Sequence, residues 1–424
     1  MARFLAGQGV PMAVADTREK PPGLAELSEV APDAAVFLGG FDESLFAAAT
    51  HLIVSPGIAL DNPAVERARK LGMPVFGDVD LFACVAKAPV IAITGANGKS
   101  TVTTLVGQMA EGDGRKVKVG GNLGTPMLDL LDTAAELYVL ELSSFQTERA
   151  SLLEPMAATV LNVSPDHMDR YASIEAYAEA KRRIFKGQGV MVLNADDALV
   201  SAMAEPGRRC VYFGLRPDAD VDYGVAIRDG EEWLMAHGEP LLPSREVRIK
   251  GRHNIANALA SLALGELAGL SRSAMLEALR QFAGLEHRMQ WVAEMGGVTW
   301  INDSKATNVG ACIAALEGLD EKAVLIAGGD GKGADFSGLV PVAKNKLRAA
   351  VLMGRDAALL EQVLSPVVPA LRVQNMKQAV EAAAKLAETG DTVLLAPACA
   401  SLDQYKDYQE RGRIFAECVQ RLSA

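Results

Sequence analysis

The sequence predicts an α/β protein of three domains built on mostly parallel sheets. The chain has 424 residues, which is too long for one ordinary hydrophobic core. Apolar runs of strand length alternate with segments of helical periodicity along almost the whole chain, which is typical of parallel sheets with crossover helices. Half of the residues are hydrophobic but only 5% are aromatic, and small side chains let helices pack closely on a sheet.

The expected strands are apolar runs, most of them bounded by Gly, Pro, Asp or Asn. In chain order they are Met12–Ala15, Ala35–Leu38, Leu52–Val54, Val90–Ile93, Leu137–Leu140, Ala158–Val163, Val190–Leu193, Val298–Ile301, Val324–Ala327, Ala350–Met353 and Val393–Ala396. Helical patterns lie between them. One stretch, Val211–Lys250, breaks the alternation with charged, turn-rich sequence, so we expect an irregular or antiparallel edge there.

Two seams divide the predicted fold. The first lies near Gly77–Asp78, and the second lies near Gly284–Glu286, after a helical stretch at Arg272–Ala283. We therefore expect a Rossmann-like domain at residues 1–77, a central domain at 78–284 with a P-loop ATPase-like, mostly parallel sheet, and a second Rossmann-like domain at 285–424.

The first domain opens unusually. Met1–Val10 resembles the end of a helix that runs into a strand finishing at Asp16. A doubly wound domain normally begins with a strand and a glycine-rich turn. We expect the first sheet to lack that strand. The start codon could be assigned too far downstream, the sequence could be truncated, or the protein could be a natural short form, and we favour the first two explanations. Loss of the strand would lower nucleotide affinity and stability.

Composition limits the kinds of partner and the cellular location that we expect for this protein. The net charge is −11, which argues against nucleic acid or an anionic membrane as the main partner. No apolar run is long enough to span a membrane, and the N-terminus is not a signal peptide, so we expect a cytoplasmic protein. Five cysteines are scattered without a C-x-x-C pair, and we interpret them as buried small hydrophobes: Cys84, Cys210, Cys312, Cys399 and Cys418.

The clearest motif is a phosphate-binding loop at Thr94–Thr101, which follows a buried strand and precedes the helical Val102–Ala110. Glycines turn backbone N–H groups onto phosphate oxygens, and the helix start adds partial positive charge. Lys99 can neutralise the β- and γ-phosphates, and the Ser100 hydroxyl can bind Mg²⁺. The match to G-x-x-x-x-G-K-[ST] is imperfect because Ile93 occupies the first glycine position. The loop predicts a nucleotide triphosphate without naming the reaction.

Two further strand ends carry candidate metal ligands. Glu141 follows one strand and His167 follows the next, so both fall at the sheet edge that carries the phosphate loop. Each residue also has an alternative role that involves no metal. Glu141 could lie next to a helix N-cap, and His167 could be a packed, hydrogen-bonded side chain. Lys181 lies on the next helical segment beside Arg182 and Arg183, and composition alone favours a solvated basic face.

Together these segments resemble the Mur ligases, the ATP-dependent amide-forming enzymes of peptidoglycan precursor synthesis. In the central domain the matching segments are Thr94–Thr101, Leu140–Gln146, Asn162–Arg170 and Gly251–Ala258. In the third domain Asn302–Asn308, Gly328–Lys332 and Pro397–Lys406 resemble the branch that adds D-glutamate to UDP-N-acetylmuramoyl-L-alanine. The resemblance covers nearly the whole chain.

The resemblance implies roles for individual residues. For ATP it implies Gly95, Asn97, Gly98, Lys99, Ser100, Thr101, Asn254, Asn257, Arg288 and Asp303. For catalysis it implies Lys99, Glu141, His167 and Lys181. One Mg²⁺ would be held by Ser100 and Glu141, and a second by His167 with Lys181. Lys181 would be carbamylated, because a free ammonium group repels a cation and has no acceptor atom.

The two remaining substrates have their own residues by the same resemblance. For D-glutamate these are Lys305, Thr307, Lys332, Ser401 and Tyr408. For the UDP substrate they are Asp16, Thr17, Arg18, Ser55, Gly57 and Asn122. We expect a monomer that forms an acyl phosphate and closes its domains around the reactants. The alternatives are an enzyme like folylpolyglutamate synthase, which Asn302–Asn308 fits poorly, and a nucleotide-binding protein that has lost catalysis.

Overall fold

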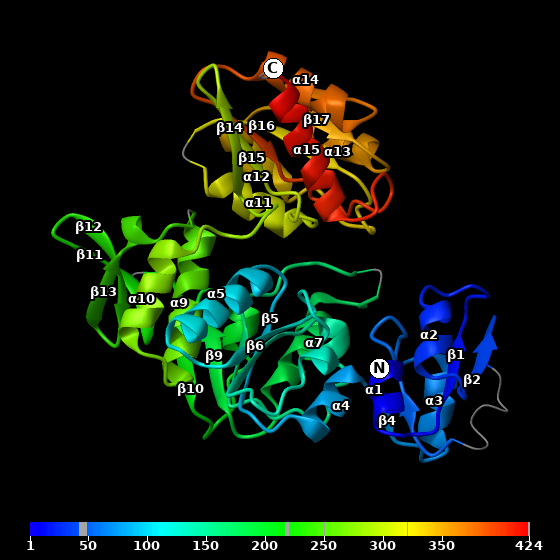
Figure 1. The fold of residues 1–424 in the computed structure, drawn as a ribbon. Helices are drawn as coiled ribbons and strands as arrows, with labels where there is room; N and C mark the ends of the chain where they lie inside the picture. The colour runs from blue at the N-terminus through cyan, green and yellow to red at the C-terminus, as the bar shows by residue number, and fades with distance from the viewer. Residues whose placement is uncertain (42–48, 169, 217–219, 250, 320, 423–424) are drawn as a thin grey trace.

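The computed structural model describes residues 1–41, 49–168, 170–216, 220–249, 251–319 and 321–422. Asp169 of the predicted His167 motif and Lys250 at the end of the predicted edge lie outside these ranges. The described chain forms three lobes in sequence order (Figure 1). The central lobe lies between the first lobe, drawn in blue, and the third lobe, drawn in yellow to red.

The first lobe contains two small sheets instead of the single expected one. Its elements are α1 (Ala2–Gly7), β1 (Ala13–Asp16), α2 (Leu24–Val30), β2 (Ala35–Leu38), β3 (Leu52–Ile53), α3 (Pro63–Lys70) and β4 (Val75–Phe76). Strand β1 pairs with β2 and β3 pairs with β4, both parallel, and among the described residues no strand joins the two pairs. All four residues of β2 are exposed, so this sheet buries little apolar surface.

The central lobe is built on a nine-stranded sheet. Its main elements are α4 (Asp78–Val85), β5 (Val90–Thr94), α5 (Lys99–Gly112), β6 (Val117–Gly121), β7 (Leu137–Glu141), α6 (Ser144–Thr147), β8 (Ala157–Val160), α7 (Ile174–Arg182), β9 (Val190–Asn194), α8 (Ala198–Ser201), β10 (Cys210–Phe213), β11 (Tyr223–Arg228), β12 (Glu231–Ala236), β13 (Glu239–Pro243), α9 (Arg252–Leu267) and α10 (Arg272–Gln281). The strand order is β13-β12-β11-β10-β9-β8-β5-β7-β6, parallel from β6 to β11. The expected antiparallel edge is formed by β11, β12 and β13.

The phosphate loop lies in the middle of this sheet. All residues of β5 and β7 are buried, because helices cover both faces of the sheet. On one face α5, α9 and α10 contribute Val102, Leu259 and Leu279 to one core, and on the other α4 and α7 contribute Phe82 and Tyr177 to a second. The carboxyl ends of β5, β7 and β8 therefore meet at one edge, where ligands of α/β folds usually bind.

The third lobe has a six-stranded sheet in the order β14-β15-β19-β16-β17-β18. Its elements are β14 (Gln290–Met295), β15 (Val298–Asn302), α11 (Val309–Glu317), β16 (Ala323–Gly328), α12 (Leu339–Lys346), β17 (Leu347–Met353), α13 (Ala357–Leu364), β18 (Ala370–Arg372), α14 (Met376–Leu386), β19 (Thr392–Leu395) and α15 (Tyr408–Leu422). Only β14 is antiparallel. Helices α14 and α15 cover one face, and α11 to α13 cover the other.

Every expected strand overlaps a strand of the structure, so the α/β fold with mostly parallel sheets is confirmed. Short or polar strands, including β6, β14 and β18, were not predicted from the sequence, because their apolar runs are weak. One strand was also predicted too long: β8 ends at Val160, since the backbone leaves the sheet to bring Asn162 to the phosphate loop.

Two further observations concern membrane-spanning helices and the burial of the cysteines. None of the described helices is long and apolar enough to cross a membrane. All five cysteines are free, and Cys312 and Cys399 are buried as expected. That expectation is wrong for the others, because Cys84 is exposed and Cys210 and Cys418 are only partly buried.

Candidate active site

The phosphate loop joins β5 to α5 and is held against α9. Gly98 has a φ of 81°, and a Cβ there would lie 2.4 Å from the Asn257 side-chain oxygen. Only glycine allows both this backbone conformation and this close approach. The Lys99 Nζ donates to the carbonyls of Gly95 and Ala96, both at 2.9 Å. Lys99 is therefore folded over the loop, where a phosphate group would meet it.

Asn162 fixes the shape of the same loop, although the sequence analysis gave it no role. Its side-chain oxygen accepts from the Asn97 backbone N–H at 2.8 Å, and its amide donates to the Asn97 carbonyl at 3.1 Å. Its backbone carbonyl accepts from Ala96 at 2.9 Å. The available signal was an asparagine near the end of a predicted strand, inside the Asn162–Arg170 segment that carries the resemblance.

Lys181 is buried beside Lys99, with 1% of its surface exposed. Its Nζ donates to the Gly95 carbonyl at 2.9 Å and lies 4.2 Å from the centre of the Tyr177 ring. Burial, together with the nearby Lys99 cation, lowers the pKa of Lys181 well below its usual value. The solvated face favoured by composition is therefore wrong for Lys181, although Arg183 is exposed.

Glu141 has a buried carboxylate with one oxygen left over. Its Oε1 accepts from the Asn122 amide at 2.7 Å, whereas its buried Oε2 has no hydrogen-bond partner among the described residues. Such an orphan oxygen costs about 1–3 kcal/mol, so it fits a cation ligand. The Ser100 hydroxyl, also buried, accepts from Arg288 Nη2 at 2.6 Å.

The Glu141 carboxylate and the Ser100 hydroxyl would suit a Mg²⁺ ion that binds together with a nucleotide. Within the described part of the chain, no group of three or more His, Cys, Asp or Glu side chains could hold a metal ion. Mg²⁺ is commonly bound by one or two carboxylates, with phosphate oxygens and water completing its shell. Glu141 with the Ser100 hydroxyl matches that pattern.

His167 lies on the loop after β8 in a left-handed backbone conformation, with a φ of 57°. Its ring packs against Phe145, with 4.9 Å between centroids, and its Nε2 lies 3.9 Å from Asp166 Oδ2. One third of the side chain remains exposed. The ring is therefore fixed by packing while part of it stays accessible to a ligand.

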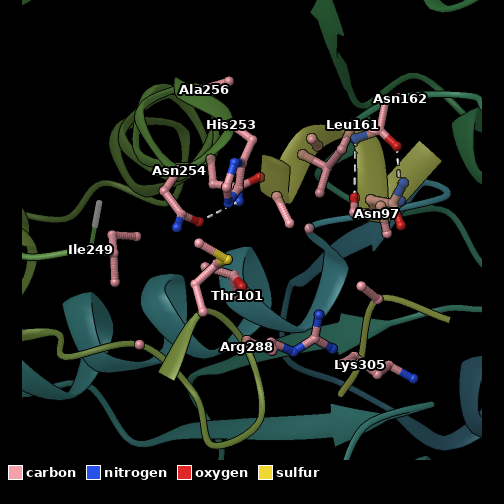
Figure 2. A pocket seen from close by; sticks show the side chains of 18 of the residues that line it. Asn97, Thr101, Leu161, Asn162, Ile249, His253, Asn254, Ala256, Arg288 and Lys305 are labelled. Carbon is pink, nitrogen blue, oxygen red and sulfur yellow. Dashed lines mark hydrogen bonds between the residues drawn. The ribbon is translucent and has the colours of Figure 1, made fainter. Parts of the chain in front are cut away.

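A cavity of about 300 Å³ lies between the central and third lobes. Figure 2 shows His253, Asn254 and Asn97 on one side of it, with Arg288 and Lys305 on segments across from them. Of the predicted site residues it gathers Asn97, Gly98, Thr101, Asn254, Asn257, Arg288, Asp303 and Lys305. The other predicted residues do not line it, so the structure brings together mainly those expected for ATP.

Helix α9 supplies one wall of this cavity. Asn257 and Asn254 are buried, and the Asn257 amide donates to the Asn254 side-chain oxygen at 3.0 Å. His253 also lines the cavity, and burial lowers its pKa. The sequence analysis missed His253, although it lies inside the predicted Gly251–Ala258 segment.

The third lobe contributes an acid and two cations. Burial raises the pKa of Asp303 to about 7, although Arg288 opposes the shift. Burial, with the nearby Arg288 and Lys99 cations, lowers the pKa of Lys305 to about 8. The Lys305 Nζ also lies 4.3 Å from the centre of the Tyr408 ring. This edge of the cavity suits an anionic ligand.

Arg411 ties together the loops that carry the other third-lobe residues. Its guanidinium group is buried and donates to the Ser304 carbonyl at 2.7 Å and to the Cys399 carbonyl at 3.1 Å. These loops carry Thr307 and the buried Ser401. Sequence analysis missed Arg411, because an arginine on an amphipathic helix looks like a surface residue.

Asp166 connects the central and third lobes. Its carboxylate accepts from Lys332 Nζ at 3.4 Å and from the Asn308 amide at 3.2 Å, both from the third lobe. The Asn308 amide also approaches the Asn97 side-chain oxygen at 3.3 Å. Lys332, which is predicted to bind D-glutamate, thus pairs with the Asp166 carboxylate, for which no role was predicted from the sequence.

The residues expected for the UDP substrate are spread over the first lobe. Asp16 and Thr17 lie where β1 ends, and the Arg18 side chain forms a 2.7 Å ion pair with Asp16, which holds the pKa of that carboxyl to about 2. Ser55 and Gly57 follow β3 and are exposed, and Asn122 lies on the central lobe beside Glu141. A second cavity of about 330 Å³ lies where these lobes meet, but it is lined by neighbours of these residues and not by the residues themselves.

Three family models match successive parts of the chain: the Mur ligase MurD-like N-terminal domain at residues 1–77, the Mur ligase middle domain at 93–265 and the Mur ligase glutamate ligase domain at 287–399. The chain belongs to the Mur ligase family. Within it, the middle-domain match spans the phosphate loop, Glu141, His167 and Lys181, and the glutamate ligase match spans Arg288 to Lys332.

Two UDP-N-acetylmuramoylalanine–D-glutamate ligases are similar to this chain over almost their whole length. The UDP-N-acetylmuramoylalanine–D-glutamate ligase of Methylococcus capsulatus is 65% identical over 421 residues, which is 99% of this chain and 92% of that protein. The ligase of that name from Nitrosococcus oceani is 55% identical over 424 residues, covering 99% and 94%.

Solved structures share the fold at low identity. MurF from Acinetobacter baumannii has a TM-score of 0.65 at 17% identity, covering 99% of this chain and 98% of that one. MurC from Thermotoga maritima has a TM-score of 0.61 at 21% identity, covering 99% and 96%. FolC of E. coli has a TM-score of 0.61 at 18% identity but covers 82% of this chain and 93% of that one.

Proposed function

We propose that this Mur ligase joins D-glutamate to UDP-N-acetylmuramoyl-L-alanine, with ATP converted to ADP and phosphate. Relatives that carry this activity in their names are 52–65% identical along the chain, which supports the assignment. The single structural observation that carries it is the cavity shared by the central and third lobes, whose lining residue Arg288 also donates to Ser100 of the phosphate loop. An enzyme like folylpolyglutamate synthase is not favoured.

ATP occupies the cavity between the central and third lobes. Its phosphates lie on the glycine loop, where Gly95, Asn97, Gly98 and Thr101 offer backbone and side-chain donors. The adenine lies by Asn254 and Asn257. Arg288 contacts the phosphates and Asp303 the ribose, and the raised pKa of Asp303 suits a carboxyl group that shares hydrogen bonds with hydroxyls.

Two Mg²⁺ ions accompany the nucleotide. Ser100 and Glu141 would hold one, and His167 with a carbamylated Lys181 would hold the second. The orphan Oε2 of Glu141 supports the first site. The lowered pKa of Lys181 supports carbamylation, because the neutral amine is the form that attacks CO₂. When bound, Mg²⁺ offsets charge on the transferring phosphoryl group.

The other substrates lie on either side of the nucleotide. D-glutamate is bound by the third-lobe residues Lys305, Thr307, Lys332, Ser401 and Tyr408. Two cations with hydroxyl groups suit a dicarboxylate. The UDP substrate extends from Asn122 toward the first lobe, with Asp16, Thr17, Arg18, Ser55 and Gly57. Asn122 also donates to Glu141, so it links this substrate to the metal ligand.

The reaction is stepwise. The terminal carboxylate of the UDP substrate attacks the γ-phosphorus, ADP leaves, and an acyl phosphate forms. Lys99 neutralises charge on the transferring group, because its ammonium already lies over the loop. The D-glutamate amine then attacks the acyl carbon and phosphate leaves. Closure of the third lobe excludes water from the acyl phosphate.

The lobes correspond to three domains at residues 1–77, 78–284 and 285–424. The family matches at 1–77, 93–265 and 287–399 fall inside these bounds, which supports the division. We propose that the enzyme acts as a monomer in the cytoplasm, where ATP and nucleotide-activated sugars are available.

The decisive experiment measures phosphate release with each substrate omitted in turn. Release should require ATP, UDP-N-acetylmuramoyl-L-alanine and D-glutamate together. Lys99→Ala should lower kcat by about 100-fold or more, because charge stabilisation of the transferring phosphoryl group is lost. Full activity in Lys99→Ala, or phosphate release with folate and L-glutamate instead, would overturn the proposal.

A further inference from the structure

Two arginines of the central lobe donate to the backbone of the loop that follows β3. Arg170 Nη1 donates to the Pro56 carbonyl at 3.3 Å, and Arg149 Nη2 donates to the Ile58 carbonyl. These carbonyls lie on either side of Gly57. The loop Ser55–Ile58, called the 55–58 loop below, is therefore held on the central lobe from two sides.

Arg149 is buried to a degree that is unusual for a cation, with 4% of its surface exposed. It packs against Gly77 at the seam between the lobes, where a Cβ would lie 2.9 Å from the Arg149 Cβ. Its Nη1 donates to the Phe145 carbonyl, while its buried Nε has no hydrogen-bond partner among the described residues. Burying this side chain is costly, and what it gains is contact with the 55–58 loop.

Glu148 organises the pair. Its Oε2 accepts from Arg170 Nη2 at 3.1 Å and lies 3.8 Å from Arg149 Nη1. Its Oε1 accepts from the Tyr171 hydroxyl at 2.5 Å. With both oxygens engaged, the carboxylate fixes the direction of both guanidinium groups.

Arg170 also contacts the side of the central lobe that carries the predicted catalytic residue His167. The Arg170 guanidinium carbon lies 4.1 Å from the centre of the Phe145 ring. The same ring also contacts His167, with 4.9 Å between centroids. A short chain of contacts thus connects the 55–58 loop through Arg170 and Phe145 to His167.

We propose that Arg149 and Arg170 are positioning residues that dock the 55–58 loop on the central lobe and so set the UDP-substrate site relative to His167. This inference rests on the proposed function, because Ser55 and Gly57 are assigned to the UDP substrate there. A purely structural role at the lobe seam is the competing explanation. It would affect stability without selecting one substrate.

The test compares Arg170→Gln, Arg170→Lys and Arg149→Lys with a matched control, Arg183→Gln. Arg183 is exposed and donates to the Glu148 carbonyl at 2.9 Å, but it forms no hydrogen bond to the 55–58 loop. KM for all three substrates, kcat and the thermal unfolding midpoint are measured for each. Arg170→Lys keeps the charge but can donate to Pro56 or to Glu148, not to both in the same geometry.

Arg170→Gln should raise KM for UDP-N-acetylmuramoyl-L-alanine by about 10-fold, as expected for a lost charged hydrogen bond, with KM for ATP changed by less than about 2-fold. Arg170→Lys and Arg149→Lys should each give an intermediate KM for this substrate, and Arg183→Gln should match the wild type. An equal rise in KM for every substrate, or the same KM shift in Arg183→Gln, would overturn the inference.

Deuterium exchange of the 55–58 amides gives a readout that needs no activity. These amides should exchange faster in Arg170→Gln than in Arg183→Gln, while those of β5 stay protected in both. Equal exchange in the two variants would overturn the docking role even in an inactive enzyme. An active wild type with an unchanged Arg170→Gln would overturn the docking role alone and leave the proposed ligase activity intact.

Discussion

Buried lysines set the chemistry of the site. Burial lowers the pKa of Lys99, Lys181 and Lys305, and each of these amines also lies near another positive charge. Glu141 and Asp166 partly oppose these shifts. The protein environment therefore disfavours the ammonium forms of these lysines, and an anionic ligand beside them would stabilise those forms.

Lys305 makes this testable through pH. Its pKa is about 8, so the ammonium form is present below pH 8 and is lost as the pH rises through that value. If the cation binds a D-glutamate carboxylate, KM for D-glutamate should rise up to about 10-fold per pH unit above 8. In Lys305→Arg, KM for D-glutamate should stay constant to higher pH. Comparing the two enzymes separates the effect of Lys305 from that of the substrate amine, which titrates in both. Identical profiles for the two enzymes would contradict the role of Lys305.

Lys181 gives a second residue-scale test. Enzyme equilibrated with carbon-13 bicarbonate should show a carbamate carbon resonance that is absent in Lys181→Arg, since a guanidinium group stays charged and does not react. Lys181→Arg should lose about 100-fold or more in kcat, because the anionic oxygens are missing. A wild-type spectrum with no such resonance would rule out carbamylation.

Glycines at strand ends decide how individual elements approach one another. Gly328 ends β16 with a φ of 117°, and a Cβ there would lie 1.9 Å from the Met353 carbonyl of β17. The loop that follows carries Lys332, itself in a left-handed conformation. A side chain at position 328 would therefore separate two buried strands just before the loop that carries Lys332, which is predicted to bind D-glutamate.

Gly328→Ala should lower the free energy of unfolding of the third lobe by about 3 kcal/mol or more, because strand separation adds to backbone strain. Gly333→Ala is the matched control, since Gly333 has a φ of 73° and no atom within 4 Å of a Cβ. It should cost only the strain of about 1–2 kcal/mol. Chemical denaturation measures both, and equal losses would show that the close approach of β16 and β17 is unimportant.

The whole molecule is held together by contacts between its lobes. Asp166 meets Lys332 and Asn308, and Arg288 meets Ser100, so the third lobe is closed on the central one. Lys332 and Ser100 are assigned to D-glutamate and Mg²⁺. Ligand binding must therefore exchange partners at both contacts.

Asp166→Ala removes the carboxylate that joins the two lobes. The radius of gyration without ligands, measured by small-angle X-ray scattering, should increase because closure is lost. ATP with both other substrates should reverse most of the change. Glu381→Ala, at a surface ion pair on α14, is the control and should scatter like the wild type. An unchanged radius in Asp166→Ala would show that closure does not depend on this residue.

The local features of this protein could be predicted from its amino-acid sequence. The glycine loop, Lys99 and Ser100 are neighbours in the chain, so their spacing alone predicted a phosphate site that the fold then formed between β5 and α5. Parallel strand ends meet at one sheet edge, so the same logic placed Glu141 and His167 beside that loop. The alternation of apolar runs predicted the α/β class because periodicity follows the backbone geometry of each element.

Contacts between side chains that are distant in sequence could not be predicted and are seen only in the folded structure. Arg288 reaches Ser100 across 188 positions and Lys332 reaches Asp166 across 166, and no local pattern records either contact. The same holds for the burial of Lys181, whose basic neighbours suggested a surface position, and for the docking of Arg149 and Arg170 on the 55–58 loop. These contacts depend on strand order and lobe packing, because burial and partner choice are fixed by elements far apart in the chain.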